Sequence, residues 1–338
     1  HPLRRAADWI MVFDVDEFVN IHVGDRSLAA LLAALPEATA IPLTWRMFGN
    51  AGQVAYADRP VTETFTRAAP TVLHWPWRAA MVKTLFRNDG SYAKLGVHRP
   101  RTPDRDRLAQ ARWFDGSGRA LGADFLTTRL FSEFGQDNYA LAQLNHYALG
   151  AMESYVVKCD RGRANREAPA FDMGYWLDRN FCDVEDRSIL ALDSEGLRAA
   201  LHADATLAAL HKAAVAWRHA RFRQLMAQEP WRALFGRLMM AQPSRALSQA
   251  EVHLIHAQLG KVLRLTGALG PLQGEPVNAV LTITLAGEAT GTRIVMEYVV
   301  GGTMRFQREQ IGPAVDGVLG DQLARLAALY SAQAKAAQ

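Results

Sequence analysis

The sequence predicts an α/β protein, in which a mixed sheet with helices is followed by a helical stretch and then by an α+β antiparallel sheet with a long C-terminal helix. Three observations predict this order. Short apolar runs alternate with helical signals in the front half, helical periodicity dominates residues 190–245, and strand-like runs then precede one long amphipathic segment. We therefore expect three parts, at residues 1–170, 171–248 and 249–338.

The front part carries alternating strand and helix signals. Residues 9–13 are an apolar run too short for a helix, which predicts a buried strand. Residues 27–35 predict a helix that is capped by Asp25 or Ser27 and stopped by Pro36. The other elements expected here are strands at 40–48, 80–87 and 141–147, and an amphipathic helix at 152–163.

The later parts differ in texture. Leucine and aromatic residues recur at helical spacing between residues 190 and 245, so this stretch is expected to be helical. Behind it the sequence predicts strands at 252–256, 262–266, 279–286 and 292–300, a hairpin loop at 287–291, and a final helix at 313–334.

Composition restricts the class of protein. The 338 residues are 49% apolar and 21% charged, which is typical of a globular chain, and a net charge of +4 is too diffuse to indicate nucleic-acid binding. We expect neither a signal peptide nor a transmembrane segment, because no apolar run approaches about 20 residues, and peripheral membrane contact stays open. Cys159 and Cys182 lack metal-ligand spacing and are expected to be free thiols in the cytoplasm, with a single bridge as the alternative.

Two carboxylates follow the first apolar run. On an extended strand Asp14 and Asp16 would project to the same side, roughly 7 Å apart. Carboxylate oxygens suit Mn²⁺ or Mg²⁺, and such ions commonly bring a phosphate with them. The alternative is a solvated turn after a strand.

A second cluster lies at 145–163. His146, at a strand end, can complete a metal shell with the two aspartates. Ser154, Lys158 and Arg161 share one face of the predicted helix, and together with Arg163 they could neutralise a diphosphate. A core histidine and a solvated basic helix end are the alternatives.

A third set combines aromatic faces with small polar groups near residue 48. Trp45, Phe48 and Asn50 suit stacking on the sugar ring of an acceptor, with core packing as an equal alternative. Three carboxylates are candidates for a catalytic base, and no motif decides between them: Glu17, Glu133 and Asp137.

Residues 8–18, 45–52, 95–99 and above all 146–162 together resemble bacterial family 2-type glycosyltransferases, in the branch related to family 92. The resemblance covers about residues 4–170. It implies a GT-A fold, a nucleotide-sugar donor and a glycan or lipid-linked acceptor. It also implies that Asp14 and Asp16 hold a divalent ion on the donor diphosphate, with His146 and residues 158–163 across it.

Both ends of the chain depart from complete domains. Enzymes of this family begin with a βαβ portion that holds the nucleoside, so we expect a chain truncated at its N-terminus, whose own turnover is in question. Residues 260–273, 291–293 and 315–326 resemble the C-terminal half of a START-like SRPBCC (helix-grip) domain. Two unrelated half-domains suggest a fused or misassembled reading frame.

Two other functions compete with sugar transfer. Haloacid-dehalogenase-type phosphatases also place Asp-x-Asp after an apolar strand, with the first Asp as nucleophile. They continue with Gly-Thr where this chain has Glu17-Phe18, and they leave no role for residues 146–162. The second alternative is a START-like protein that binds a small apolar ligand through the C-terminal part.

Overall fold

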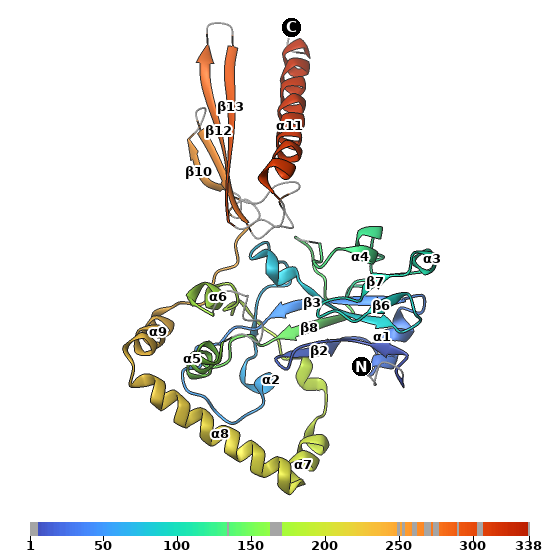
Figure 1. Cartoon of the computed structure of the whole chain (residues 1–338), viewed down its shortest axis with the longest axis vertical. Helices are drawn as coiled ribbons and strands as arrows, with labels where there is room; N and C mark the ends of the chain where they lie inside the picture. The colour runs from blue at the N-terminus through green and yellow to red at the C-terminus, as the bar shows by residue number, and fades with distance from the viewer. Residues whose placement is uncertain are drawn as a thin grey trace. The chain divides into compact units, whose positions relative to one another are not determined.

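The computed structural model describes residues 6–133, 135–162, 171–248, 251, 254–258, 262–266, 272, 277–288, 291–302 and 307–336. The chain forms two compact units, His1–Ala246 and Leu247–Gln338 (Figure 1). The first unit contains every residue that the sequence marks as a candidate for catalysis or binding. Each unit is mixed from helices and strands, so the prediction of an α/β chain is confirmed at that level.

A mixed sheet of five strands forms the centre of the first unit. Its order is β1-β5-β3-β8-β2, in which β3 and β8 run parallel and the other neighbours run antiparallel. The bounds are β1 Trp9–Ile10, β2 Glu17–Ile21, β3 Ala40–Met47, β5 Val82–Arg87 and β8 Ala142–His146. The strands predicted at 40–48, 80–87 and 141–147 are therefore confirmed, to within two residues at each end.

Burial explains why these strands could be predicted. All eight residues of β3 and all five of β8 are buried. Ile41 and Leu43 of β3, Leu85 of β5 and Leu144 of β8 share one core cluster with Leu31 of α1 (Leu28–Ala34). This helix begins after Ser27, whose hydroxyl accepts a hydrogen bond from the Ala30 amide at 3.1 Å, as the sequence predicts.

The strand predicted over residues 9–13 is confirmed only for Trp9–Ile10, which is half-buried, and is wrong for residues 11–13. Only Trp9–Ile10 is paired, to Arg87 and Phe86 of β5, and residues 11–14 are irregular. β1 and β2 lie at opposite edges of the sheet, so the chain between them crosses the end of the sheet and cannot stay paired. Phe13 is consequently 51% exposed and Val15 is 98% exposed.

Short elements surround this sheet. They are α2 Val61–Thr64, β4 Arg67–Ala68, η2 Trp77–Ala80, β6 Tyr92–Lys94, β7 Arg101–Pro103, α3 Arg105–Leu108, α4 Ala123–Thr127, α6 Met173–Leu177, β9 Val184–Glu185 and η3 Ser188–Ala191. Two further two-stranded sheets pair β4 with β9 and β6 with β7.

A helical layer completes the first unit. α7 (Glu195–Ala203), α8 (Ala205–Met226) and α9 (Glu229–Met240) confirm the helical prediction for residues 190–245. Tyr155 of α5 (Met152–Arg161), Leu225 of α8, Leu238 of α9 and Trp176 of α6 form one fully buried cluster. This cluster holds α8 against α5, the helix that carries the basic candidates.

The second unit is an antiparallel sheet and one long helix. Its strands are β10 Leu254–Gln258, β11 Val262–Thr266, β12 Val277–Glu288 and β13 Gly291–Gly302, in sequential order, and its helix is α11 Arg308–Ala336. The predicted hairpin and final helix are confirmed, whereas residues 252–253 of the first predicted strand lie outside the described residues. The likeness to a helix-grip domain stays a prediction.

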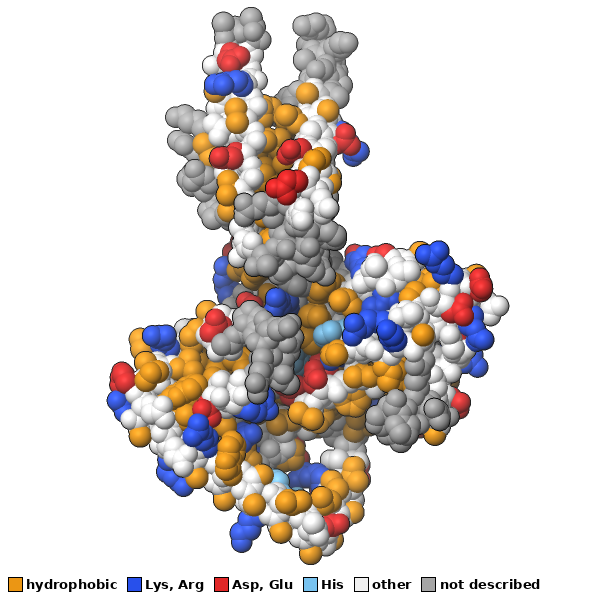
Figure 2. Space-filling model, viewed as in Figure 1, with side chains coloured by type: hydrophobic (Ala, Val, Ile, Leu, Met, Phe, Trp, Pro, Cys, Tyr) orange, Lys and Arg blue, Asp and Glu red, His pale blue; other side chains and the backbone are white. Residues whose placement is uncertain are grey.

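The surface of the described residues is mixed in character. Figure 2 shows Lys and Arg side chains at several separate places on the visible face, with Asp and Glu side chains between them.

Cys159 and Cys182 are both free thiols, as predicted. Among the described helices none has the length and apolarity to cross a membrane.

Candidate active site

The carboxylates near residue 16 lie on a tight turn that leads into β2. The Glu17 amide donates to the Asp14 carbonyl at 3.1 Å, and the Asp14 amide donates to Glu17 Oε2 at 2.8 Å. We call the segment Asp14–Glu17 the acid turn. Asp14 and Asp16 therefore project from a turn, as in the alternative weighed above, rather than from one side of a strand.

A buried lysine lies beneath the acid turn. Lys83 of β5 has no exposed side-chain surface, and its Nζ lies 3.0 Å from Asp14 Oδ2 and 3.5 Å from Glu17 Oε2. The other oxygen of Glu17 accepts from Trp45 Nε1 at 2.7 Å. Burial raises the pKa of Glu17, while the Asp14 amide and Lys83 act in the opposite direction. The first candidate base is thus a buried group that holds the turn in place.

Asp16, on the other side of the turn, meets the second cluster. Its Oδ2 lies 3.1 Å from Lys158 Nζ and its Oδ1 lies 4.0 Å from His146 Nε2. The sheet produces this meeting, because Glu17 of β2 is paired with His146 of β8 and the Tyr147 amide donates to the Asp16 carbonyl at 2.9 Å. Lys158 also donates to the Ala148 carbonyl at 2.6 Å, so two acceptors hold its ammonium group.

His146 is held as a neutral imidazole. It is buried, its ring lies 4.3 Å from that of Trp45, and burial together with nearby Arg179 and Lys158 holds its pKa well below the ordinary value. Its Nδ1 has no hydrogen-bond partner among the described residues. A neutral imidazole beside a carboxylate is a suitable pair of ligands for a divalent ion.

The predicted metal ligands are close together without forming a complete shell. Among the described residues, no three His, Cys, Asp or Glu side chains are arranged to hold a metal ion. Asp14 is directed to Lys83, with 61% of its side chain exposed, whereas Asp16 and His146 face each other. The pair could supply two ligands of a metal shell, and phosphate oxygens of a bound ligand would have to supply others.

A pocket of about 280 Å³ opens beside Asp16. We call it the cationic pocket, because four basic side chains line it: Arg59, Lys158, Arg161 and Arg218. Three of the four predicted diphosphate-binding residues, Ser154, Lys158 and Arg161, therefore share one hollow, as their helical spacing predicts. The fourth, Arg163, lies outside the described residues.

The predicted acceptor-binding residues lie in the core. Trp45 is 7% exposed, and Phe48 and Asn50 are each 2% exposed, so none of them offers a face to a sugar ring in this structure. Phe48 packs on Tyr147 with ring centroids 4.7 Å apart. Asn50 stabilises its own turn, since its Nδ2 donates to the Gln53 carbonyl at 2.6 Å. Core packing, the alternative that the sequence left open, describes all three.

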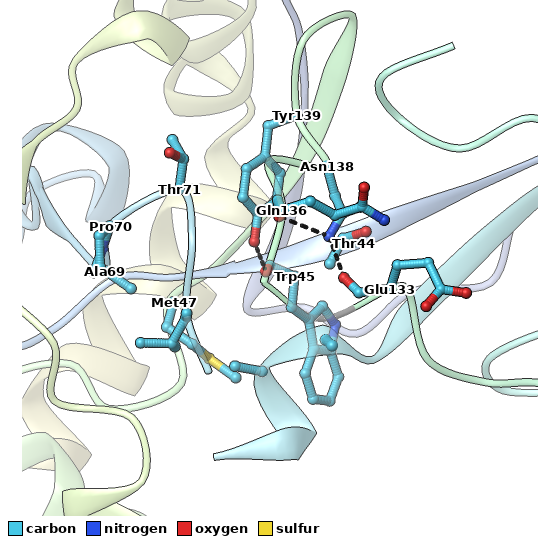
Figure 3. Close-up of a pocket in the computed structure, with 13 residues that line it drawn as sticks. Thr44, Trp45, Met47, Ala69, Pro70, Thr71, Glu133, Gln136, Asn138 and Tyr139 are labelled. Carbon is cyan, nitrogen blue, oxygen red and sulfur yellow. Dashed lines mark hydrogen bonds between the residues drawn. The ribbon is translucent and has the colours of Figure 1, made fainter. Parts of the chain in front are cut away.

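The other two candidate bases lie on the loop that precedes β8. Glu133 is paired with Arg129 at 2.6 Å, and Asp137 Oδ1 accepts from the Tyr139 amide at 2.8 Å. Glu133 lines a small cavity together with Trp45 and Tyr139 (Figure 3). The cavity measures about 20 Å³, which is room for a water molecule and too little for a sugar.

The structure adds residues that the sequence analysis did not single out. Lys83 had a signal, because it lies in a predicted strand between Val82 and the apolar pair Leu85-Phe86, where a lysine needs a buried partner. Arg59, Trp217 and Arg218 had none, since the loop before α2 and the middle of α8 approach residue 158 only in the folded chain.

No protein-family model matches the chain. No curated protein matches it significantly.

Proposed function

We propose that this chain is a metal-dependent glycosyltransferase, which moves a sugar from a nucleotide-sugar donor to a glycan or lipid-linked acceptor. One observation carries the proposal. Asp16 lies 3.1 Å from Lys158, a residue 142 positions away in the chain, and 4.0 Å from His146. A carboxylate, an imidazole and a cation thus meet at the edge of a pocket whose other charges are basic.

The residues divide the expected work between them. Asp16 and His146 would hold Mn²⁺ or Mg²⁺, and Asp14 would join them only by leaving Lys83. When bound, such an ion stabilises the negative charge that develops on a departing diphosphate. Lys158 and Arg161 bind phosphate oxygens from α5, where their positive charge favours the leaving group.

Removal of the proton from the acceptor hydroxyl falls to an exposed carboxylate. Glu17 is 2% exposed and is engaged by Trp45 and Lys83, so we assign it a positioning role. Glu133 and Asp137 are both exposed, and they remain the candidate bases of this proposal.

The test measures thermal stabilisation of the whole chain by UDP, GDP, CDP or ADP together with Mn²⁺. At a hundredfold excess over Kd, one of these ligands should stabilise the fold by about 2.7 kcal/mol, which raises Tm by about 5–10 °C. Asp16→Asn should abolish this rise, because the variant loses the carboxylate charge that faces His146. Glu37→Gln, at an exposed carboxylate elsewhere in the first unit, is the matched control and should keep it.

A second assay follows the release of nucleoside diphosphate from a panel of nucleotide sugars. Release that depends on Mn²⁺ and on Asp16 supports the proposal. If none of the four diphosphates stabilises the wild-type chain, the proposal is wrong. Hydrolysis of p-nitrophenyl phosphate that Asp14→Asn abolishes would instead favour a phosphatase.

A further inference from the structure

The cationic pocket has an excess of positive charge. Among its described lining residues there are four basic side chains and a single carboxylate, that of Asp16. Asp16 is paired with Lys158 at 3.1 Å, so its negative charge is balanced by Lys158 and does not offset the three arginines. Arg59, Arg161 and Arg218 have no carboxylate of the described residues within 4.0 Å.

Other arginines near the pocket, in contrast, are paired with carboxylates. Arg221, three residues after Arg218 on α8, holds both oxygens of Asp160 at 2.7 and 2.8 Å. Arg198 of α7 is paired with Glu63 at 2.7 Å. Like charges around one hollow repel each other, so a bound anion would stabilise the three guanidinium groups of the pocket.

Arg218 is held in place by neutral groups. Its Nη1 donates to Ser154 Oγ at 2.8 Å, and its guanidinium carbon lies 4.5 Å from the centre of the Tyr56 ring. Tyr56 is in turn fixed to α5, because its amide donates to Glu153 Oε2 at 3.0 Å. A guanidinium on such a support keeps N–H donors for a ligand at little entropic cost.

The side of α8 that lines the pocket also carries an aromatic residue. Trp217 lines the same pocket and is 57% exposed. An exposed indole beside unpaired cations suits a ligand that joins a flat ring to an anionic group. Ser154, which accepts from Arg218, lies one helical turn, about 6 Å along α5, before Lys158.

We propose that α8 forms one wall of a diphosphate site, in which Arg218 together with Arg59 and Arg161 binds the phosphate oxygens and Trp217 stacks on the ring attached to them. The site thereby extends beyond the part of the chain that resembles a glycosyltransferase, into the helical layer. Whether the diphosphate belongs to a nucleotide or to a lipid-linked acceptor rests on the proposed function. The binding of an anion in the pocket does not rest on that function.

Inorganic pyrophosphate without metal is the first probe, and titration calorimetry on the whole chain measures its Kd. Arg218→Gln should weaken binding about tenfold, because it removes charge-assisted hydrogen bonds. Arg221→Gln, which changes the same helix outside the pocket, is the matched control and should stay within about twofold. Equal binding by wild type and Arg218→Gln, or an equal loss in Arg221→Gln, overturns the proposal.

Arg59→Gln provides a second variant in case Arg218→Gln does not fold. Arg59 is exposed on a loop and has no ion pair among the described residues, so its removal should spare the fold and weaken pyrophosphate binding about threefold. Unchanged binding in this variant also counts against the site.

UDP is the second probe and separates the ring from the phosphates. Trp217→Ala should weaken UDP several-fold while it leaves pyrophosphate within about twofold. An equal effect on both probes overturns the stacking role. Pyrophosphate binding that depends on Arg218, with no response to any nucleoside diphosphate, keeps the anion site and contradicts the proposed sugar transfer.

Discussion

Replacing Lys83 by Met removes the cation beneath the acid turn and keeps nearly the same side-chain length. The side chain of Lys83 is fully buried, as is that of Glu17, whose Oε2 lies 3.5 Å away. The variant therefore leaves a buried carboxylate without its cation, with only the Trp45 and Asp14 N–H groups as donors. Breaking a buried pair in this way costs about 3–5 kcal/mol.

For a unit of this size that loss should lower Tm by about 6–20 °C in a thermal melt. Two further variants control the interpretation. The side chain of Asp14, the other partner of Lys83, is 61% exposed. Asp14→Asn should therefore cost less than about 1 kcal/mol. Lys83→Met combined with Glu17→Gln should recover much of the loss, because no charge is then buried.

The pH dependence tests the same reasoning. Lys83 lowers the pKa of Glu17 against the effect of burial, so its loss should raise that pKa further. A carboxyl group with a raised pKa in the folded chain destabilises it above that pKa, and the cost disappears as the pH falls and the group is protonated. The difference in stability between wild type and Lys83→Met should therefore narrow from about pH 7 to about pH 5. A Tm change below about 2 °C, or a difference that is constant with pH, would refute the argument.

Two other predictions concern the core. The pKa of His146 is lowered from 6.5 by burial, so below that pH the unfolded chain binds a proton that the folded chain does not, and stability falls by up to about 1.4 kcal/mol per pH unit. His146→Gln should flatten this fall in urea unfolding between about pH 7 and about pH 5; an unchanged slope would contradict it. A Cβ at Gly49 would lie 2.4 Å from both Cys182 Sγ and the Phe181 carbonyl oxygen, so Gly49→Ala should cost about 1–3 kcal/mol. Gly236→Ala, in α9 with open space around it, should gain about 0.5–1 kcal/mol in the same assay, and equal effects would contradict the packing.

Much of the fold could be predicted because burial and sequence pattern agree there. β3 and β8 are both buried along their whole length. The apolar residues of β3 are interrupted only by Thr44 and Arg46, whereas Ala142 and Leu144 of β8 alternate with polar side chains. The face shared by Ser154, Lys158 and Arg161 follows from helical spacing alone, and all three line one pocket.

The rest depended on contacts that no local pattern contains. Residues 9–13 are apolar enough for a strand, yet only two of them find a partner strand. The sequence around Trp45 and Asn50 is the same whether these residues contact a sugar or belong to the core. Only their burial in the folded chain separates the two roles. Arg218 reaches the pocket through the packing of α8 on α5, which links residues 64 positions apart.

The strand that carries the acid turn is an edge strand, and its open side is protected by a much later segment. Asn20 of β2 donates to Ser188 Oγ of η3 at 2.7 Å. Arg26 bridges the Ile21 carbonyl at 3.3 Å and the Ser188 carbonyl at 3.0 Å. A chain that ended at residue 170 would lack η3 and leave the outer edge of β2 open to any other strand in solution, which is the usual route to edge-to-edge aggregation. Residues 1–170 alone are therefore expected to aggregate more readily than the whole first unit, in which η3 contacts β2.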